Sequence, residues 1–311
     1  MRHVRWRSGT IVALFFLAML PPPADPQEPP NYEFIPGEWY RMPTHFGPRT
    51  GPRRGPDGKK FENIDYPKAT SVSVRFHTNR DQLQKMLPEG FAVGAEPVVS
   101  VTMTYITEIP WLAGRGYNTL GVSFPAEFNG EADQARGSFL LVLWENLTDP
   151  ILTGREELGF SKIYAELPPP RVYEDDTHVM ASWLGFKFMD MDLTNMEQVE
   201  VQSPAPTSSQ GQDNGVITGQ MHYKHFPRTG EWGKADVSYA VIAPSGNSNA
   251  RTLELWRGEG TVEFHRARWE DMSTQYNVVN AFADLEIIEW RGATISKGVG
   301  GKDLSGQRII R

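Results

Sequence analysis

Residues 71–76 read Ser-Val-Ser-Val-Arg-Phe. Apolar and polar side chains alternate here with a period of two, which is typical of a half-buried β-strand. Shortly after this run, Asn79 is suited to cap a short helix that contains Leu83 and ends before Pro88. The ordered part of the chain is therefore predicted to begin with a strand and a short helix.

Nine further segments have the composition of strands, and turn residues separate nearly all of them. Only two or three short helices fit between them. Many short strands without alternating helices predict a mainly β fold, either an antiparallel sandwich or a barrel. The segments are 97–106, 119–128, 138–144, 161–166, 178–189, 215–223, 236–242, 252–264 and 283–289.

The chain has 311 residues, of which 39% are hydrophobic, so a sizeable core is expected. Neither an internal repeat nor a change of composition divides residues 61–290, and a single domain is the simplest interpretation. Residues 26–60 are rich in Pro and Gly and are interpreted as a linker and an irregular arm. Residues 291–311 are interpreted as a C-terminal tail.

The N-terminus resembles an export signal. Basic residues precede the apolar run 10–20, which three prolines follow. Such a run suits a signal sequence and is too short to span a bilayer. With a genuine leader at 1–25 the protein is secreted or periplasmic, and otherwise it is cytoplasmic. An uncleaved leader is the one expected membrane attachment, and a start at Met42 is the other alternative.

Composition excludes several classes of function. The formal net charge of −7 argues against nucleic acid as a partner. Cysteine is absent, which removes disulfides, thiolate catalysis and Cys-based metal sites. The acidic residues 174–176, which His178 follows, are interpreted as a solvated loop, because a hard-cation site needs ligands from several segments. No metal site is expected.

The chemically informative stretch is 154–164, which reads Gly-Arg-Glu-Glu-Leu-Gly-Phe-Ser-Lys-Ile-Tyr. In an extended chain Lys162 shares one face with Phe160 and Tyr164. Burying an ammonium is costly, so an inward-facing lysine between two aromatic residues indicates a function. The alternative is that this face points outward and that Lys162 is an ordinary solvated lysine.

The same stretch resembles the active-site segment of the acetoacetate decarboxylase family, in which Gly-Arg-Glu precedes an aromatic residue, a small residue and the Schiff-base lysine. Here these are Gly154 to Glu156 and then Phe160, Ser161 and Lys162. Residues 76–89, 114–118 and 122–124 are similar to other family segments, so the likeness covers roughly 60–290. The resemblance implies an antiparallel β-barrel, a homo-oligomer and no cofactor.

The resemblance also implies a mechanism. The lysine amine attacks the ketone of a β-keto acid, water leaves, and the protonated imine accepts the electrons released with carbon dioxide. Attack requires the neutral amine, whereas free lysine is almost wholly protonated at pH 7. Such a site therefore has to lower the pKa of its lysine by desolvation or by a nearby cation, an activation for which acetoacetate decarboxylase is itself a known example.

The sequence departs from the family pattern around the expected substrate carboxylate. Ile163 replaces the second lysine that follows the nucleophile in the best-known decarboxylases, and the carboxylate-binding arginine expected near 61–69 has no match. The family's two glutamates fall near Thr102 and Thr119. The site residues that the resemblance then implies are Lys162 and Glu108 as catalytic groups, with Phe160, Tyr164, Tyr117, Arg115 and Lys68 around the substrate and Arg49 as another source of positive charge.

Three hypotheses remain open from the sequence. The first is a decarboxylase of a β-keto acid that acts through Lys162. The second keeps the imine but uses it for aldol, retro-aldol or dehydration chemistry on an oxo acid, which the altered carboxylate-binding residues favour. The third is a non-catalytic barrel that binds a small ligand.

Overall fold

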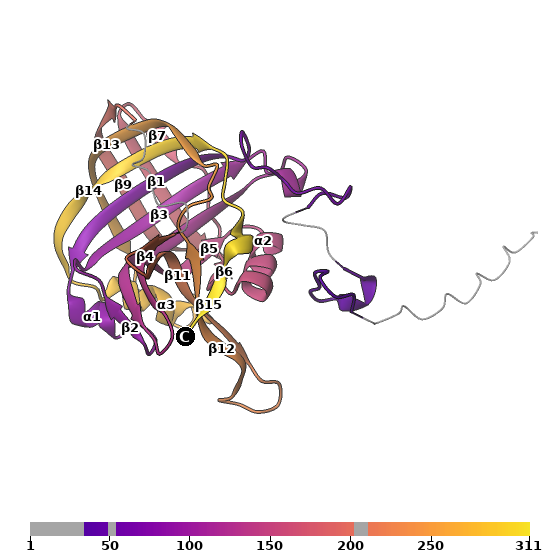
Figure 1. Ribbon diagram of the computed structural model, residues 1–311. Helices are drawn as coiled ribbons and strands as arrows, with labels where there is room; N and C mark the ends of the chain where they lie inside the picture. Colours follow the sequence, from indigo (N-terminus) through magenta and orange to yellow (C-terminus); the bar gives the residue numbers. More distant parts are fainter. Residues whose placement is uncertain (1–33, 49–53, 202–210) are drawn as a thin grey trace, which may run out of the picture. The chain divides into compact units, whose positions relative to one another are not determined.

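The computed structural model describes residues 34–48, 54–201 and 211–311 (Figure 1). The chain divides into two units, Met1–Pro48 and Arg49–Arg311. The described part of the first unit contains one short 3-10 helix, η1 (Thr44–Phe46). The predicted leader, 1–25, lies outside the described residues, as does Arg49.

The described residues of the second unit form one sheet of fifteen strands. The strands are β1 (Lys68–Thr78), β2 (Phe91–Val93), β3 (Val98–Thr107), β4 (Tyr117–Asn129), β5 (Gln134–Glu145), β6 (Lys162–Tyr164), β7 (Arg171–Tyr173), β8 (Asp176–Trp183), β9 (Phe186–Val199), β10 (Gln212–Asp213), β11 (Val216–Pro227), β12 (Ala235–Pro244), β13 (Arg251–Phe264), β14 (Ile287–Val299) and β15 (Arg308–Ile310).

The helices of this unit are short. They are α1 (Arg80–Gln84), η2 (Pro110–Leu112), α2 (Thr148–Thr153), the π-helical turn η3 (Gly154–Leu158), α3 (Tyr276–Ala283) and η4 (Leu304–Gly306). The prediction of a mainly β fold with few short helices is therefore confirmed.

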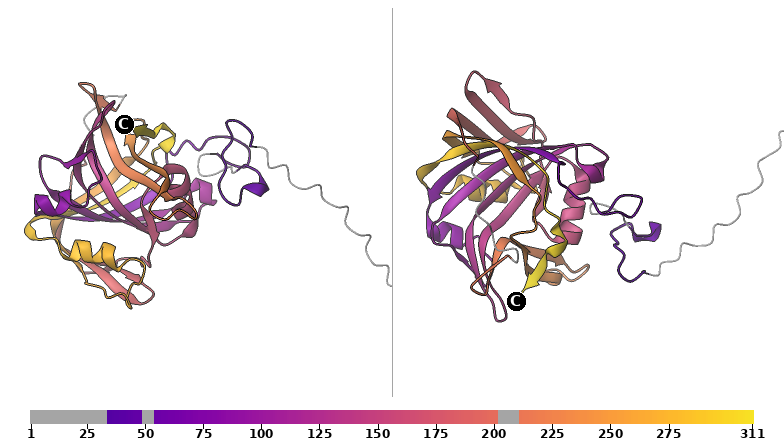
Figure 2. Two further views of the ribbon diagram at one scale, coloured as in Figure 1. Left: turned by 90° about the horizontal axis from the view of Figure 1, so that it is seen from below. Right: turned by 45° about the horizontal axis from the view of Figure 1, so that its top comes forward.

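The strands follow the order β15-β12-β11-β5-β4-β3-β1-β14-β13-β9-β8-β7, and β10, β2 and β6 pair beside this path. The sheet curves strongly (Figures 1 and 2), but its two end strands do not pair, so it is a barrel only in a loose sense. Most neighbours are antiparallel, as predicted. However, β5 runs parallel to both β6 and β11, and the first of these parallel pairs positions the site.

Strand β1 contains the alternating run of residues 71–76. Its inward side chains Val72, Val74 and Phe76 are at most 2% exposed. The predicted cap is also present, because the side chain of Asn79 accepts a hydrogen bond of 2.9 Å from the backbone N–H of Asp81. The local sequence was sufficient to predict β1 and the start of α1. The alternation of apolar residues matches the buried face of β1, and Asn79 caps the helix that follows.

The prediction of one strand at 178–189 is wrong. The structure has two antiparallel strands there, β8 and β9, joined by a tight turn at Leu184 and Gly185. Both turn residues have positive φ, 47° and 88°, as the turns of two-residue hairpins require. The turn was hard to predict from the sequence because Leu184 occupies it, and a large apolar residue rarely has positive φ.

Residues 291–311, expected to form a tail, belong instead to the sheet and to the site. Strand β14 continues to Val299 and pairs with both β1 and β13. The backbone then runs beside the segment before β1, where Gly301 donates a hydrogen bond to the carbonyl of Asn63. Within the described ranges, no helix has the length and apolar character needed to cross a membrane. The homo-oligomer stays a prediction.

The core lies inside the curved sheet and is closed at one end by α3. The ring of Phe282 on this helix packs 6.1 Å from that of Trp144 and 5.2 Å from that of Phe264. Before the helix, the side chain of Gln275 accepts a hydrogen bond from the indole of Trp144 and donates one to the carbonyl of Tyr164. The buried core is thereby tied directly to the short strand β6.

Candidate active site

The pairing of β5 with β6 brings Lys162 and Glu145 together. In this parallel ladder Lys162 lies opposite Leu143, and Glu145 is two residues further along β5. Because side chains two residues apart on a strand point to the same face, Glu145 and Lys162 share one face of the sheet. Ile163, which replaces the family's second lysine, points to the other face.

Lys162 is buried, with 9% of its side chain exposed. Its Nζ lies 2.8 Å from Oε1 of Glu145, donates a hydrogen bond of 3.1 Å to the carbonyl of Pro150, and lies 5.9 Å from the ring centre of Phe160. The alternative of a solvated lysine is therefore excluded. The amine faces a carboxylate, a carbonyl and an aromatic ring instead of bulk water.

Sequence reasoning missed Glu145. Its side chain is 1% exposed, and among the described residues Oε2 has no hydrogen-bond partner. Burial raises the pKa of this carboxyl, and the charge of Lys162 partly opposes the rise. A signal was present in the sequence, because Glu145 directly follows the apolar run 139–144 of a predicted strand. Its partner became evident only from the strand pairing.

Polar side chains contact the carbonyl groups of the turn that precedes Lys162 and hold this turn in place. Arg155 donates a hydrogen bond of 2.9 Å to the carbonyl of Lys162 itself. From β11, Lys224 donates one of 2.7 Å to the carbonyl of Glu156, and Nε2 of His222 lies 2.9 Å from the carbonyl oxygen of Leu158. The carbonyl groups at the end of this turn are thus satisfied by side chains of a neighbouring strand, which fixes the start of β6.

His222 gives the protein a predictable acid sensitivity. The imidazole is fully buried, and burial lowers its pKa from 6.5 to about 4, although the bond to the Leu158 carbonyl favours the charged form. The unfolded chain therefore binds a proton between pH 6.5 and 4 that the folded chain does not. Stability falls as the pH drops through this window, by about 3 kcal/mol in total. We expect His222→Gln to lose less stability than the wild type between pH 7 and 4 in urea unfolding followed by circular dichroism. Parallel losses in the two proteins contradict the prediction.

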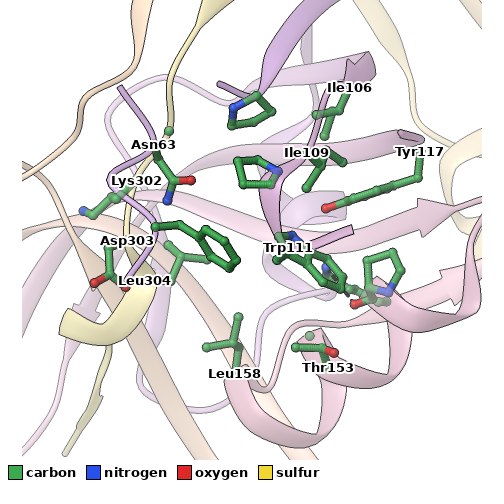
Figure 3. A pocket seen from close by; sticks show the side chains of 17 residues that line it. Asn63, Ile106, Ile109, Trp111, Tyr117, Thr153, Leu158, Lys302, Asp303 and Leu304 are labelled. Carbon is green, nitrogen blue, oxygen red and sulfur yellow. Dashed lines mark hydrogen bonds between the residues drawn. The ribbon is translucent and has the colours of Figure 1, made fainter. Parts of the chain in front are cut away.

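A pocket of about 210 Å³ opens beside Lys162. Figure 3 shows Trp111 and Leu158 at its wall and the hydroxyl of Tyr117 pointing inward near Ile109. Its walls are mostly apolar, and burial, with the nearby charge of Glu145, keeps the pKa of Tyr117 above its usual value. The lining residues are Phe61, Asn63, Pro67, Ile106, Ile109, Pro110, Trp111, Tyr117, Pro150, Thr153, Gly154, Leu158, Lys162, Gly301, Lys302, Asp303 and Leu304.

Of the residues expected around the substrate, the pocket brings together Lys162 and Tyr117. Phe160 contacts the lysine, but its ring stacks on His222 at 4.1 Å and faces another hollow. Tyr164 is 41% exposed and does not line the pocket, although its carbonyl accepts a hydrogen bond from Gln275. Phe160 does not share the expected common face with Lys162 and Tyr164, since the strand begins only at Lys162.

The expected charged residues also lie outside the pocket. Lys68 and Glu108 pair with each other at 2.7 Å, with 52% and 44% of their side chains exposed. Arg115 is exposed and donates a hydrogen bond to the carbonyl of Leu112. The placement of Glu108 beside the lysine was therefore incorrect, because its backbone belongs to the loop after β3, and Glu145 occupies that place.

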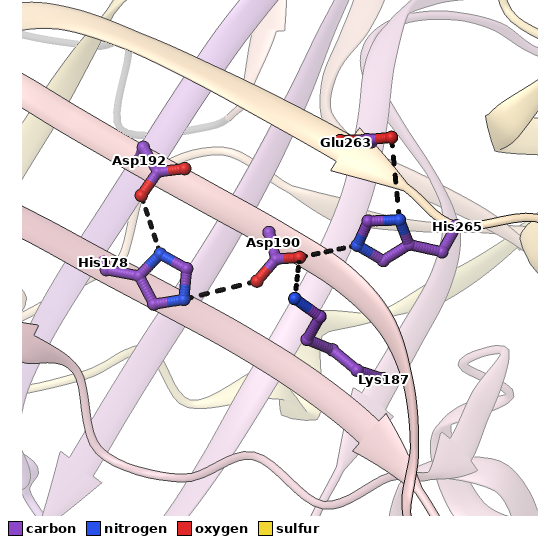
Figure 4. A network of polar contacts seen from close by, with 6 residues as sticks. All are labelled: His178, Lys187, Asp190, Asp192, Glu263 and His265. Atoms are coloured by element: carbon purple, nitrogen blue, oxygen red, sulfur yellow. Dashed lines mark hydrogen bonds and ion pairs between the residues drawn. The ribbon is translucent and has the colours of Figure 1, made fainter.

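A second polar cluster ties β8 and β9 to the end of β13 (Figure 4). Asp190 accepts contacts from Lys187 at 2.6 Å and from His265 at 2.5 Å. His178 lies between two carboxylates, 2.6 Å from Asp192 and 3.2 Å from Asp190. Burial raises the pKa of Asp190, but its bonds to Lys187 and His265 outweigh this and hold the pKa below its usual value. Across the described ranges, no group of three or more His, Asp or Glu residues is arranged to hold a metal ion.

Known proteins resemble this chain in sequence and in fold. The family model for acetoacetate decarboxylase matches residues 41–294. An acetoacetate decarboxylase of Clostridium botulinum is 26% identical over 164 residues, which cover 49% of this chain and 60% of the relative, so the match spans less than two thirds of that protein.

Solved structures share the fold. A structure of acetoacetate decarboxylase superposes with a TM-score of 0.56 at 15% identity, covering 80% of this chain and 91% of the other. The enduracididine biosynthesis enzyme MppR, complexed with the condensation product of pyruvate and imidazole 4-carboxaldehyde, superposes with a TM-score of 0.54 at 18% identity, covering 82% and 94%.

Proposed function

The chain belongs to the acetoacetate decarboxylase family, and from this premise we propose that Lys162 forms an imine with the carbonyl carbon of a small oxo acid. The family includes decarboxylases and related Schiff-base enzymes. One observation carries the proposal, namely that the amine of Lys162 is enclosed at the wall of a pocket, 2.8 Å from a buried carboxylate. Lysines are rarely buried unless they are paired, and a buried, desolvated amine is suited to nucleophilic attack.

The first candidate reaction is decarboxylation of a β-keto acid. The amine attacks the ketone, and water is lost. The carbon of the resulting protonated imine is bonded to the carbon that carries the carboxylate. When the bond to the carboxylate breaks, its electron pair moves into the imine to give an enamine, and carbon dioxide leaves. Protonation of the enamine carbon and hydrolysis then release the ketone. The apolar walls suit this step, because the negative charge of the carboxylate disappears as carbon dioxide forms.

The second candidate is condensation or dehydration through the same imine. Lys162 and Lys302 are the cationic residues that line the pocket within the described ranges, and Figure 3 shows the amine of Lys302 pointing away from Trp111 and Tyr117. Among the described residues, the pocket therefore offers a substrate carboxylate no arginine of the kind that the family uses. MppR, which shares this fold, binds the condensation product of pyruvate and imidazole 4-carboxaldehyde, and this supports the second candidate.

Reductive trapping tests the proposal. We expect borohydride added in the presence of acetoacetate or pyruvate to leave a stable adduct on the peptide that contains Lys162, identified by mass spectrometry. Lys162→Arg keeps the positive charge but cannot form an imine, so its adduct is expected to be absent. Lys302→Arg is the matched control at the same pocket and is expected to be labelled like the wild type.

The outcomes separate the hypotheses. An adduct with release of carbon dioxide supports the decarboxylase. An adduct without carbon dioxide, from acetoacetate and from longer β-keto acids, supports condensation or dehydration. The absence of an adduct with every oxo acid tested overturns both reactions and leaves a pocket that binds a small ligand without catalysis.

A further inference from the structure

The contact between Glu145 and Lys162 carries an inference beyond the identity of the nucleophile. Glu145 is 1% exposed, its Oε1 lies 2.8 Å from Nζ, and its Oε2 has no hydrogen-bond partner among the described residues. An unpartnered carboxylate oxygen in a water-poor site is expensive. A buried ion pair also contributes little to stability compared with apolar side chains of similar size. A contribution to stability therefore does not explain why Glu145 and Lys162 are buried together, whereas a role in catalysis does.

We propose that Glu145 is the acid and base of imine formation: it accepts a proton from the ammonium of Lys162 and later gives that proton to the departing hydroxyl group. The inference rests on the proposed function, since it concerns the same lysine. Ile163 has replaced the neighbouring lysine whose charge could lower the pKa of the nucleophile, and in this chain a carboxylate removes the proton instead.

The sequence of steps balances. Transfer of one proton from the ammonium to the carboxylate gives a neutral amine and a carboxylic acid. The amine attacks the carbonyl carbon, the carbonyl electron pair moves to oxygen, and a proton passes from nitrogen to that oxygen to give a carbinolamine. Glu145 then protonates the hydroxyl, the carbon–oxygen bond breaks, and the nitrogen lone pair forms the protonated imine. The net change is ammonium plus ketone to iminium plus water, and Glu145 is again a carboxylate.

Geometry allows a single carboxyl to perform both transfers. The carbinolamine oxygen is bonded to the carbon that Nζ has attacked, so it is two bonds from Nζ, and Oε1 already lies 2.8 Å from Nζ. This is within the hydrogen-bond distance that proton transfer requires. Burial favours the transfer, because a neutral amine beside a neutral acid loses less hydration than two ions do.

Among the described residues, no group other than Glu145 is both in contact with Nζ of Lys162 and able to accept its proton. Tyr117 lies on the adjacent strand β4. Burial and the charge of Glu145 raise the pKa of its phenol, which therefore remains protonated. Arg155 contacts the carbonyl of Lys162, not its amine. The other contacts of Nζ are the carbonyl of Pro150 and the face of Phe160, neither of which accepts a proton at neutral pH.

The test is the pH dependence of reductive trapping. Glu145→Gln preserves size but cannot take a proton, so we expect the trapping rate with a saturating oxo acid to fall about 10²- to 10⁴-fold at pH 7. The variant's amine then loses its proton only to solvent, and its rate is expected to rise about tenfold per pH unit from pH 6 to 8. The wild-type rate is expected to be much flatter over the same range.

Glu145→Asp supplies the control for a purely structural role. It retains a carboxylate at a longer distance, so it is expected to trap more slowly than the wild type while keeping the flatter pH profile. Labelling of the wild type with an unchanged rate and profile in Glu145→Gln overturns the role of Glu145 and leaves the imine at Lys162 intact. Failure of the wild type to form any adduct overturns the proposed function instead. Thermal unfolding of each variant verifies that the rates compare folded proteins.

Discussion

Gly154→Ala is expected to slow imine formation at Lys162 about 100-fold or more while leaving the fold intact. A methyl group at this position overlaps Cδ and Cε of Lys162 and lies 2.7 Å from its Nζ. The flexible lysine side chain can give way, but it then leaves its place beside Glu145. A displacement of about 1 Å at a reacting group commonly costs a factor of 100 in rate. The measurement is the rate of borohydride trapping with a saturating oxo acid.

The backbone at Gly154 makes this a clean substitution. Its φ of −65° and ψ of −38° are helical, and alanine is more favourable than glycine in a helical turn by about 1 kcal/mol. This preference offsets only part of the stability lost when Lys162 moves away from Glu145, so the protein is expected to stay folded with a lower melting temperature. Gly306→Ala is the matched control, because nothing lies within 4 Å of its added methyl group. Wild-type trapping by Gly154→Ala contradicts the placement of the lysine against this turn.

Lys162→Met is expected to destabilise the protein by about 3–5 kcal/mol near pH 8. The substitution leaves Glu145 buried without its countercharge, and breaking a buried pair from one side carries a penalty of this size. The carboxyl can escape the penalty by binding a proton. Burial already raises its pKa, and the loss of Lys162 removes the influence that lowered it. Urea unfolding of both proteins at a series of pH values measures the difference.

The sign of the pH effect follows from this linkage. In the variant the folded carboxyl binds its proton more tightly than the unfolded one, whose pKa is near 4.5. The stability that this proton confers is present below pH 4.5 and is lost as the pH rises through the folded pKa. The gap between variant and wild type is therefore expected to be small in acid and to widen toward pH 8.

A double variant completes the experiment. Lys162→Met with Glu145→Leu replaces both ions by apolar side chains, and such replacements are often neutral or stabilising. We expect it to recover most of the stability lost in Lys162→Met and to lose the added pH dependence. A single variant as stable as the wild type at pH 8 means that the two side chains do not form a buried pair.

The sequence by itself determined the class of the fold and the position of the lysine that we propose as the nucleophile. Strand β1 was predictable because its period of two coincides with burial on one face, and Asn79 marks the following helix by its own hydrogen bond. These are local properties, since each depends on residues close together in the chain. The segment around Lys162 was recognisable for a similar reason, as its residue types follow one another directly.

The surroundings of that lysine were decided only by the tertiary structure. Glu145 lies on a different strand, and the parallel register of β5 and β6 places it on the face of Lys162. Glu108 was the nearer choice in the aligned sequence but lies on an exposed loop, paired with Lys68. The pocket likewise takes one wall from Phe61 and Asn63 and another from 301–304. Strand pairing sets such contacts through hydrogen bonds between distant segments, and hydrophobic periodicity gives the face of a side chain but not its partner across the sheet.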